Sequence, residues 1–164
     1  MSKAKTEIMS LFLRNLFFTI LQPGMVAGLI PYWILEKKVE DTFAQTFNLY
    51  QYLAALLLVI GFAIMITCII GFAIYGSGTL SPADPTKKLV IKGLYRYSRN
   101  PMYVGVMLML IAESIFFQSV TLWRYTVFIF IAFYVFILIH EEPRLKRDFG
   151  DEYNQYIKKV RRWF

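Results

Sequence analysis

The sequence has very little cysteine and histidine: one residue of each among 164. The lone Cys68 has no partner for an intramolecular disulfide, and with His140 alone beside it the usual zinc ligand sets cannot be assembled. Acidic residues are also scarce, 11 against 18 lysines and arginines, which gives a net charge of +7. Such a charge can attract nucleic acid, but membrane boundaries explain it better here. We therefore expect neither a metal nor a nucleic-acid partner.

Apolar residues, in contrast, are abundant. The chain is 57% hydrophobic and 18% aromatic, with a mean hydropathy of +0.49. This composition is too apolar for a soluble domain of this size and predicts an integral membrane protein. The first apolar stretch continues too far for a signal peptide and has no small-residue cleavage site. We expect a single membrane domain over residues 1–164.

Long apolar runs predict an all-α bundle of about four transmembrane helices. In the first run, Pro23-Gly24 should kink the helix, which is then either one bent span or a re-entrant pair of half-helices. Before the third run, Asn100 can cap the helix, and Pro101 suits its first turn. The second run has 27 residues and exceeds the ~30 Å hydrocarbon core at ~1.5 Å per residue. The four runs are residues 11–35, 49–75, 102–117 and 122–139.

The positive charges indicate how such a bundle is oriented. Four spans put both termini and the 76–101 loop on one side. That side carries 14 of the 18 lysines and arginines: two near the N-terminus, five in the loop and seven in the tail. The positive-inside rule predicts that this side is cytoplasmic, in the inner or plasma membrane of the cell.

The polar tail has a helical pattern of its own. Apolar residues recur at a spacing of three and four, and lysines and arginines fill the other face. The pattern predicts an amphipathic helix at the cytoplasmic interface, and the alternative is a tail that only anchors to anionic lipid. Its apolar positions are Tyr153, Tyr156, Ile157 and Val160.

Three short motifs should meet at the cytoplasmic face, because successive spans alternate in direction. Gly76-Ser77-Gly78 follows the second span, Arg99-Asn100-Pro101-Met102-Tyr103 opens the third, and His140-Glu141-Glu142 ends the fourth. Each motif has a plainer explanation. The glycines can end a helix, Asn-Pro can start one, and the arginines can set topology. Two adjacent carboxylates are harder to explain that way, since acidic residues contribute little to topology, although a helix that starts at Pro143 would favour negative charge there through its dipole.

Together the three motifs suit a zwitterionic, nucleotide-like ligand. Glycines let the backbone approach a ligand closely. Carboxylates can hold an ammonium group, and an arginine can hold a carboxylate. Tyrosines can stack on a base or lie beside a cation.

The motifs also resemble a known family. Arg99-Asn100-Pro101-Met102-Tyr103-Val104-Gly105, then Glu141-Glu142-x-x-Leu145, then Phe149-Gly150-x-x-Tyr153-x-x-Tyr156 follow at the spacing of the isoprenylcysteine carboxyl methyltransferases and the related phospholipid N-methyltransferases. The similarity covers about residues 76–163, and the Pro-Gly in the first segment is similar to small bacterial members.

The resemblance implies an integral membrane enzyme that uses S-adenosylmethionine. It implies cofactor binding by Gly76, Ser77, Gly78, Asn100, Pro101, Tyr103, His140, Glu141 and Glu142, and a catalytic role for Arg99 and Tyr103. In the prenylcysteine branch a histidine stands at the position of Asn100. The implied partners are membrane lipids and a lipid-like or lipidated acceptor.

Several alternatives stay open at this stage. The acceptor can be a prenylcysteine carboxylate, a phospholipid amine or a small thiol. The chain can instead be an NADPH-dependent enzyme of the sterol-reductase type, or a membrane protein without enzymatic activity. Glu113, ~15 Å along the helix from Tyr103, is either functional or paired with Arg124 across the turn at 118–121.

Overall fold

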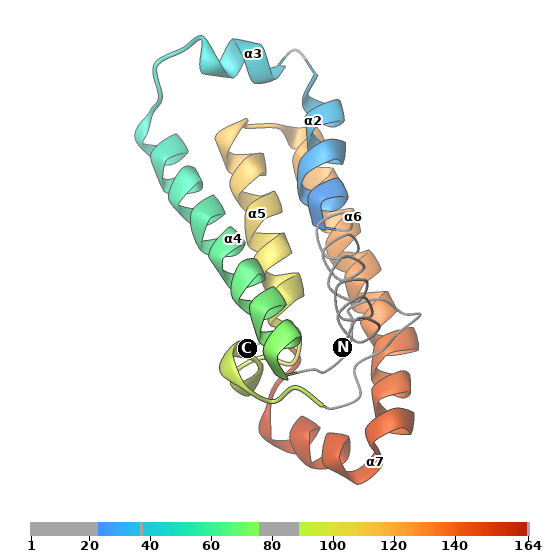
Figure 1. The fold of residues 1–164 in the computed structure, drawn as a ribbon. Helices are drawn as coiled ribbons and strands as arrows, with labels where there is room; N and C mark the ends of the chain where they lie inside the picture. Colours follow the sequence, from blue (N-terminus) through green and yellow to red (C-terminus); the bar gives the residue numbers. More distant parts are fainter. Residues whose placement is uncertain (1–22, 37, 76–88, 164) are drawn as a thin grey trace, which may run out of the picture.

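The computed structural model describes residues 23–36, 38–75 and 89–163, and within these ranges the chain is helical, with no β-strand. Figure 1 shows α4, α5 and α6 running beside one another, with α7 folded across one end of the bundle. Two π-helical turns and one 3₁₀ turn, labelled η, accompany the α-helices. The elements are η1 (Met25–Leu29), α2 (Ile30–Leu35), α3 (Lys38–Phe43), α4 (Leu49–Tyr75), η2 (Gly93–Arg96), α5 (Pro101–Phe116), α6 (Val120–Phe136), η3 (Ile137–Glu141) and α7 (Glu142–Lys159).

The helices have the character expected of a membrane bundle. Within the described ranges, α4 and the helix that begins at Val120 are long and apolar enough to cross a bilayer, whereas α5 is shorter. Large apolar side chains on the outer face of α6, such as Phe128 and Ile131, are exposed, as lipid-facing residues would be. The all-helical prediction is confirmed. The number of crossings and the orientation in the membrane stay predictions.

The predicted runs agree with the described helices to within two residues except at the end of the fourth, and the start of the first run lies outside the described residues. The second run matches α4, and α5 begins at Pro101, one residue before the third run. The fourth run does not end at residue 139, because the helix continues through η3 into α7. Pro143 lies at the change from the π-helical turn η3 to α7. The bend comes instead at Gly150, whose φ of +49° is accessible mainly to glycine.

Within the described residues, the first segment is distorted at Ala27. Gly24 has helical dihedral angles, whereas Ala27, within η1, is non-helical with φ −108° and ψ 19°. The Tyr125 hydroxyl of α6 donates a hydrogen bond of 2.9 Å to the Val26 carbonyl beside this irregular residue. The residues before Pro23 lie outside the described part of the chain. Whether the first segment is kinked at Pro23-Gly24, and whether it spans the bilayer, both stay predictions.

A glycine contact brings α4 and α5 close together. A Cβ atom added to Gly61 would lie 2.8 Å from the Gly105 carbonyl oxygen, and one added to Gly105 would lie 2.8 Å from the Gly61 carbonyl oxygen. Small residues allow this kind of close backbone approach between membrane helices. Below it, Met65, Val106 and Leu110 form part of the buried core. The contact lies two residues from Tyr103 and therefore fixes where the start of α5 is held.

Glu113 does not form the pair that we considered for it. In the described part of the chain no ion pair joins Glu113 to Arg124, and the Glu113 Oε2 atom is buried without a hydrogen-bond partner. The prediction of an interhelical pair is wrong because of helical phase. Leu122 and Thr126 form the buried face of α6, and Arg124, two residues from each, lies on the exposed face.

Candidate functional site

The start of α5 and the end of η3 lie at the same end of the bundle, next to α7 (Figure 1). This convergence was predicted from the alternating direction of the segments. It brings the Asn-Pro motif and the two glutamates together. Gly76-Ser77-Gly78, the third motif, lies outside the described residues.

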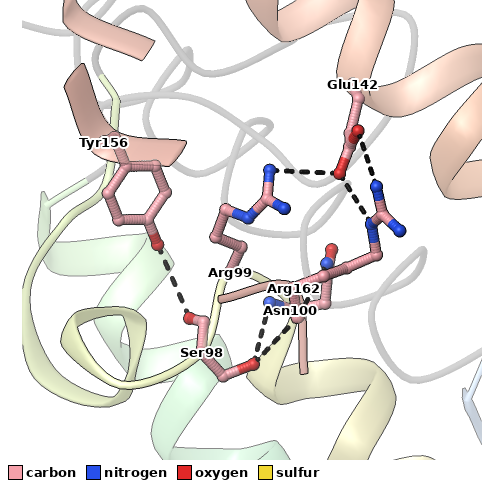
Figure 2. A network of polar contacts seen from close by, with 6 residues as sticks. All are labelled: Ser98, Arg99, Asn100, Glu142, Tyr156 and Arg162. Carbon is pink, nitrogen blue, oxygen red and sulfur yellow. Dashed lines mark hydrogen bonds and ion pairs between the residues drawn. The ribbon is translucent and has the colours of Figure 1, made fainter. Parts of the chain in front are cut away.

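The loop before α5 is fixed to α7 by a tyrosine. Tyr95 and Ser98 are buried, and the Tyr156 hydroxyl donates hydrogen bonds to their carbonyl oxygens at 2.6 and 3.5 Å (the second is drawn in Figure 2). Burial raises the pKa of Tyr156 above its ordinary value, so the hydroxyl remains a donor. Around Tyr153, Tyr156 and Val160 lie further apolar residues of α7 together with Leu89 and Ile91 of the loop.

This packing corrects the prediction for the tail. The apolar face of the C-terminal helix is not free to lie on lipid, because the loop covers much of it. Tyr153 is 2% exposed and Tyr156 is 5% exposed. The amphipathic pattern was identified correctly, but its apolar side packs on protein.

The last residues of the chain cross the loop, and we name Val160–Trp163 the C-terminal strap. The Arg99 backbone N–H donates to the Arg161 carbonyl oxygen at 2.9 Å. Two side chains donate to the Arg162 carbonyl oxygen, Asn100 Nδ2 at 3.1 Å and Ser98 Oγ at 3.3 Å. The strap therefore runs directly beside the start of α5.

Asn100 consequently plays another part than the one predicted. It occupies the N-cap position of α5, but its side chain makes no capping hydrogen bond. The amide instead binds the Arg162 carbonyl, and Ser98 Oγ accepts a hydrogen bond from the Asn100 backbone N–H at 3.1 Å. Pro101, buried in the first turn of α5, lacks an N–H that would need a cap.

Glu142 is the centre of a charged cluster (Figure 2). Its Oε1 atom is 3.1 Å from Arg99 Nη1 and accepts a hydrogen bond of 2.8 Å from Arg162 Nε. Its Oε2 atom accepts a hydrogen bond of 3.2 Å from Arg162 Nη2. The side chains of Glu142 and Arg99 are each 13% exposed. Two arginines thus hold one largely buried carboxylate by charge-assisted hydrogen bonds.

Glu141, the adjacent carboxylate, has different surroundings. Its Oε2 atom accepts a hydrogen bond of 3.0 Å from the Tyr103 hydroxyl, and the Tyr103 ring packs on Phe133 with centroids 4.7 Å apart. Glu141 lies beyond the predicted fourth span. Burial raises its pKa above the ordinary value, and the Tyr103 hydrogen bond and the charge of Arg144 oppose that rise. Neighbouring carboxylates with unlike environments can take unlike roles.

The raised pKa of Glu141 predicts a dependence of stability on pH. A raised pKa in the folded state means that the folded protein holds the proton more tightly. This contribution to stability is present at and below pH 4.5, the ordinary value, and is lost as pH rises through the folded-state pKa. In Glu141→Gln the amide oxygen can still accept from Tyr103, and we expect this part of the slope to disappear. Melting temperatures of both proteins from pH 4.5 to neutral pH measure the effect. Parallel curves would contradict it.

Most of the predicted residues within the described ranges come together. Arg99 pairs with Glu142, and Asn100 is linked to Glu142 through Arg162. Tyr103 is hydrogen-bonded to Glu141, the sequence neighbour of Glu142. His140 is exposed and packs on Phe136, with ring centroids 5.3 Å apart. His140 is therefore next to Glu141 in sequence, but its side chain packs on Phe136 and not on the cluster.

Arg162 is the residue that the sequence interpretation missed. It was counted only among the tail charges that set topology. A usable signal is its position between Val160 and Trp163, two large apolar residues that favour packing on protein over a free tail. Val160 is buried, and the Trp163 ring lies 5.5 Å from that of Phe130 in α6.

The cluster still has donors to offer a ligand. The Nε atoms of Arg99 and Arg144 are buried and have no hydrogen-bond partner among the described residues. Buried unsatisfied donors of this kind are costly and require an explanation. A bound carboxylate would satisfy them. A carboxylate also has about four acceptor positions, of which Glu142 uses three on arginines.

Comparison with known proteins extends this description. The described residues combine helices of membrane-spanning length with a polar cluster where the start of α5, the end of η3 and α7 meet. The family model for phospholipid methyltransferase matches residues 49–152, more than half of the chain. The chain belongs to this family of membrane methyltransferases, and the resemblance seen in the motifs is confirmed.

A similar protein carries no functional description. The chain is 34% identical over 62 residues to an uncharacterized protein of Haemophilus influenzae, a stretch that covers 38% of this chain and 98% of that protein. No solved structure matches the chain.

Proposed function

We propose that the protein transfers a methyl group from S-adenosylmethionine to a lipid-like or lipid-modified acceptor at the cytoplasmic membrane face, as isoprenylcysteine carboxyl methyltransferases do. The observation that carries the proposal is the Glu142 cluster at the helix ends of a phospholipid methyltransferase family member. It combines a held carboxylate with arginine donors that lack partners. Those are the groups that a zwitterionic amino-acid moiety requires.

The residues fit the cofactor in kind. The free acceptor position of Glu142 suits the ammonium group of its methionine part, and the buried Arg144 Nε suits the carboxylate. The predicted contribution of Gly76, Ser77 and Gly78 is close backbone approach.

When bound, the cofactor supplies a methyl group on a sulfonium, which is already a good leaving group. The protein then contributes mainly alignment and exclusion of water. A carboxylate acceptor needs no base, and Arg99 would orient it.

An amine acceptor is the second candidate, and the surroundings of Glu141 favour it. An ammonium acceptor must lose a proton before its nitrogen can attack the methyl carbon. Glu141 makes no ion pair with an arginine in the described part of the chain, unlike Glu142, and Tyr103 holds one of its oxygens. Such a carboxylate can take that proton and release it to water afterwards.

Calorimetric titration of the purified full chain tests the proposal. We expect binding of S-adenosylhomocysteine and none of NADPH. Binding of NADPH alone would favour a reductase, and binding of neither would favour a protein without enzymatic activity.

The acceptor class can then be determined with membranes and a methyl-labelled cofactor. A carboxyl methyl ester releases volatile methanol in alkali, whereas an N-methyl group is retained in the lipid extract. Label that alkali releases supports the carboxyl acceptor. Label that remains in the lipid supports the amine.

A further inference from the structure

Every residue of the C-terminal strap contacts α6, α7 or the loop before α5. Val160 is buried against Tyr153 and Tyr156, and Trp163 packs on Phe130. Between them, the carbonyl oxygens of Arg161 and Arg162 accept hydrogen bonds from the loop before α5. These contacts hold the strap in place without any help from the Arg162 guanidinium.

The Arg162 side chain connects the strap to the cluster. Its guanidinium binds both oxygens of Glu142, at 2.8 and 3.2 Å, and lies over the Tyr134 ring, 5.5 Å from its centroid. The hydrogen bonds to Glu142 raise the pKa of Arg162 above its ordinary value. A planar guanidinium that makes two parallel hydrogen bonds fixes both the position and the rotation of a carboxylate, which a lysine cannot do.

We infer that Arg162 is a positioning residue for the amino-acid part of the cofactor: it orients Glu142 through its guanidinium and Asn100 through its backbone carbonyl. This inference rests on the proposed function and assigns Arg162, alone among the strap residues, to the binding site.

Two features explain why the site needs this residue. Glu142 is largely buried, and a buried carboxylate without partners would lose its charge or move toward water. Arg99 alone reaches only Oε1, which leaves the carboxylate free to rotate. With Arg162 on both oxygens, the remaining acceptor position of Glu142 has one fixed direction, so it can be offered to an ammonium group.

The test compares two ligands on the full-length chain. S-Adenosylhomocysteine carries the amino-acid part, whereas methylthioadenosine has the same adenosine and thioether without it. We expect Arg162→Ala to weaken S-adenosylhomocysteine binding by about tenfold or more and to leave methylthioadenosine binding unchanged. A merely structural role would weaken both.

Arg161→Ala is the matched control, because Arg161 is exposed and contributes only its backbone carbonyl. It should bind both ligands like the unaltered chain. If Arg162→Ala does not fold, Arg162→Lys replaces it, with Arg161→Lys as control; the lysine keeps the charge, loses the paired hydrogen bonds and should give a smaller loss confined to S-adenosylhomocysteine.

Three results would overturn the inference. Unchanged or tighter S-adenosylhomocysteine binding in the Arg162 variants would show that the guanidinium does not support the ligand. Equal loss of both ligands would show a structural role. If the unaltered chain does not bind S-adenosylhomocysteine, the proposed function fails together with the inference, whereas the first two results leave the proposed function intact.

Discussion

Replacing Glu142 by glutamine is expected to weaken S-adenosylhomocysteine binding by about 100-fold, or about 2.7 kcal/mol, and to abolish measurable methyl transfer. The substitution removes the charge that would attract the ammonium group. It also leaves Arg99 and Arg162 without their common anion, and removing one partner of a buried charge pair is costly. Titration calorimetry measures the affinity, and transfer of labelled methyl groups measures the activity.

Glu152→Gln is the control for this prediction. Glu152 lies on the same helix, α7, but is exposed, so its replacement changes the net charge by the same amount away from the cluster. It should bind and react like the unaltered chain. Normal binding by Glu142→Gln would contradict the assignment of Glu142 to the cofactor site. Equal loss in both variants would attribute the effect to overall charge.

Long apolar runs are sufficient to predict the helices and the all-α fold class, because a bilayer requires uninterrupted helical segments. Alternation of direction is then sufficient to place Asn100 at the same end of the bundle as Glu141 and Glu142. These predictions depend on length, composition and order along the chain, all of which are visible in the sequence.

Contacts between distant segments are the part that the sequence does not reveal. Asparagine favours helix N-caps, but the Asn100 amide donates instead to the carbonyl oxygen of Arg162, 62 positions away. The tail has the pattern of an interfacial helix, but its apolar face packs against Leu89 and Ile91 of the loop. In both cases local propensity was identified correctly, and tertiary packing decided the partner.

The role of Arg162 was hidden for a related reason. The positive-inside rule already explains a lysine or arginine near a membrane boundary, so the charge of Arg162 does not by itself indicate a binding role. Its role depends on the two oxygens of Glu142, 20 positions earlier, and on the bend at Gly150 that turns the tail back.

The glycine contact between α4 and α5 predicts the largest effect on stability. Gly105→Ala would put a methyl group 2.8 Å from the Gly61 carbonyl oxygen and 3.0 Å from the Met65 backbone nitrogen. Both neighbours are backbone atoms of a helix, so relief requires the helices to separate. We expect a loss of about 1–3 kcal/mol in the free energy of unfolding, and failure to fold for Gly105→Leu. Thermal unfolding in detergent measures the first, and the yield of folded protein the second.

Gly71→Ala provides the matched control, since a Cβ atom on this α4 residue meets nothing within 4 Å. Alanine there should keep or raise stability, because it favours a helix more than glycine does by up to about 1 kcal/mol.

Gly61→Ala should resemble Gly105→Ala, and the double variant should lose less than the two single losses together, because the first separation makes room for the second methyl group. Separation of the helices also moves Tyr103 away from Glu141, so cofactor affinity should fall with stability in Gly105→Ala but not in Gly71→Ala. Equal stability of the Gly105 and Gly71 variants would contradict the close approach of α4 and α5.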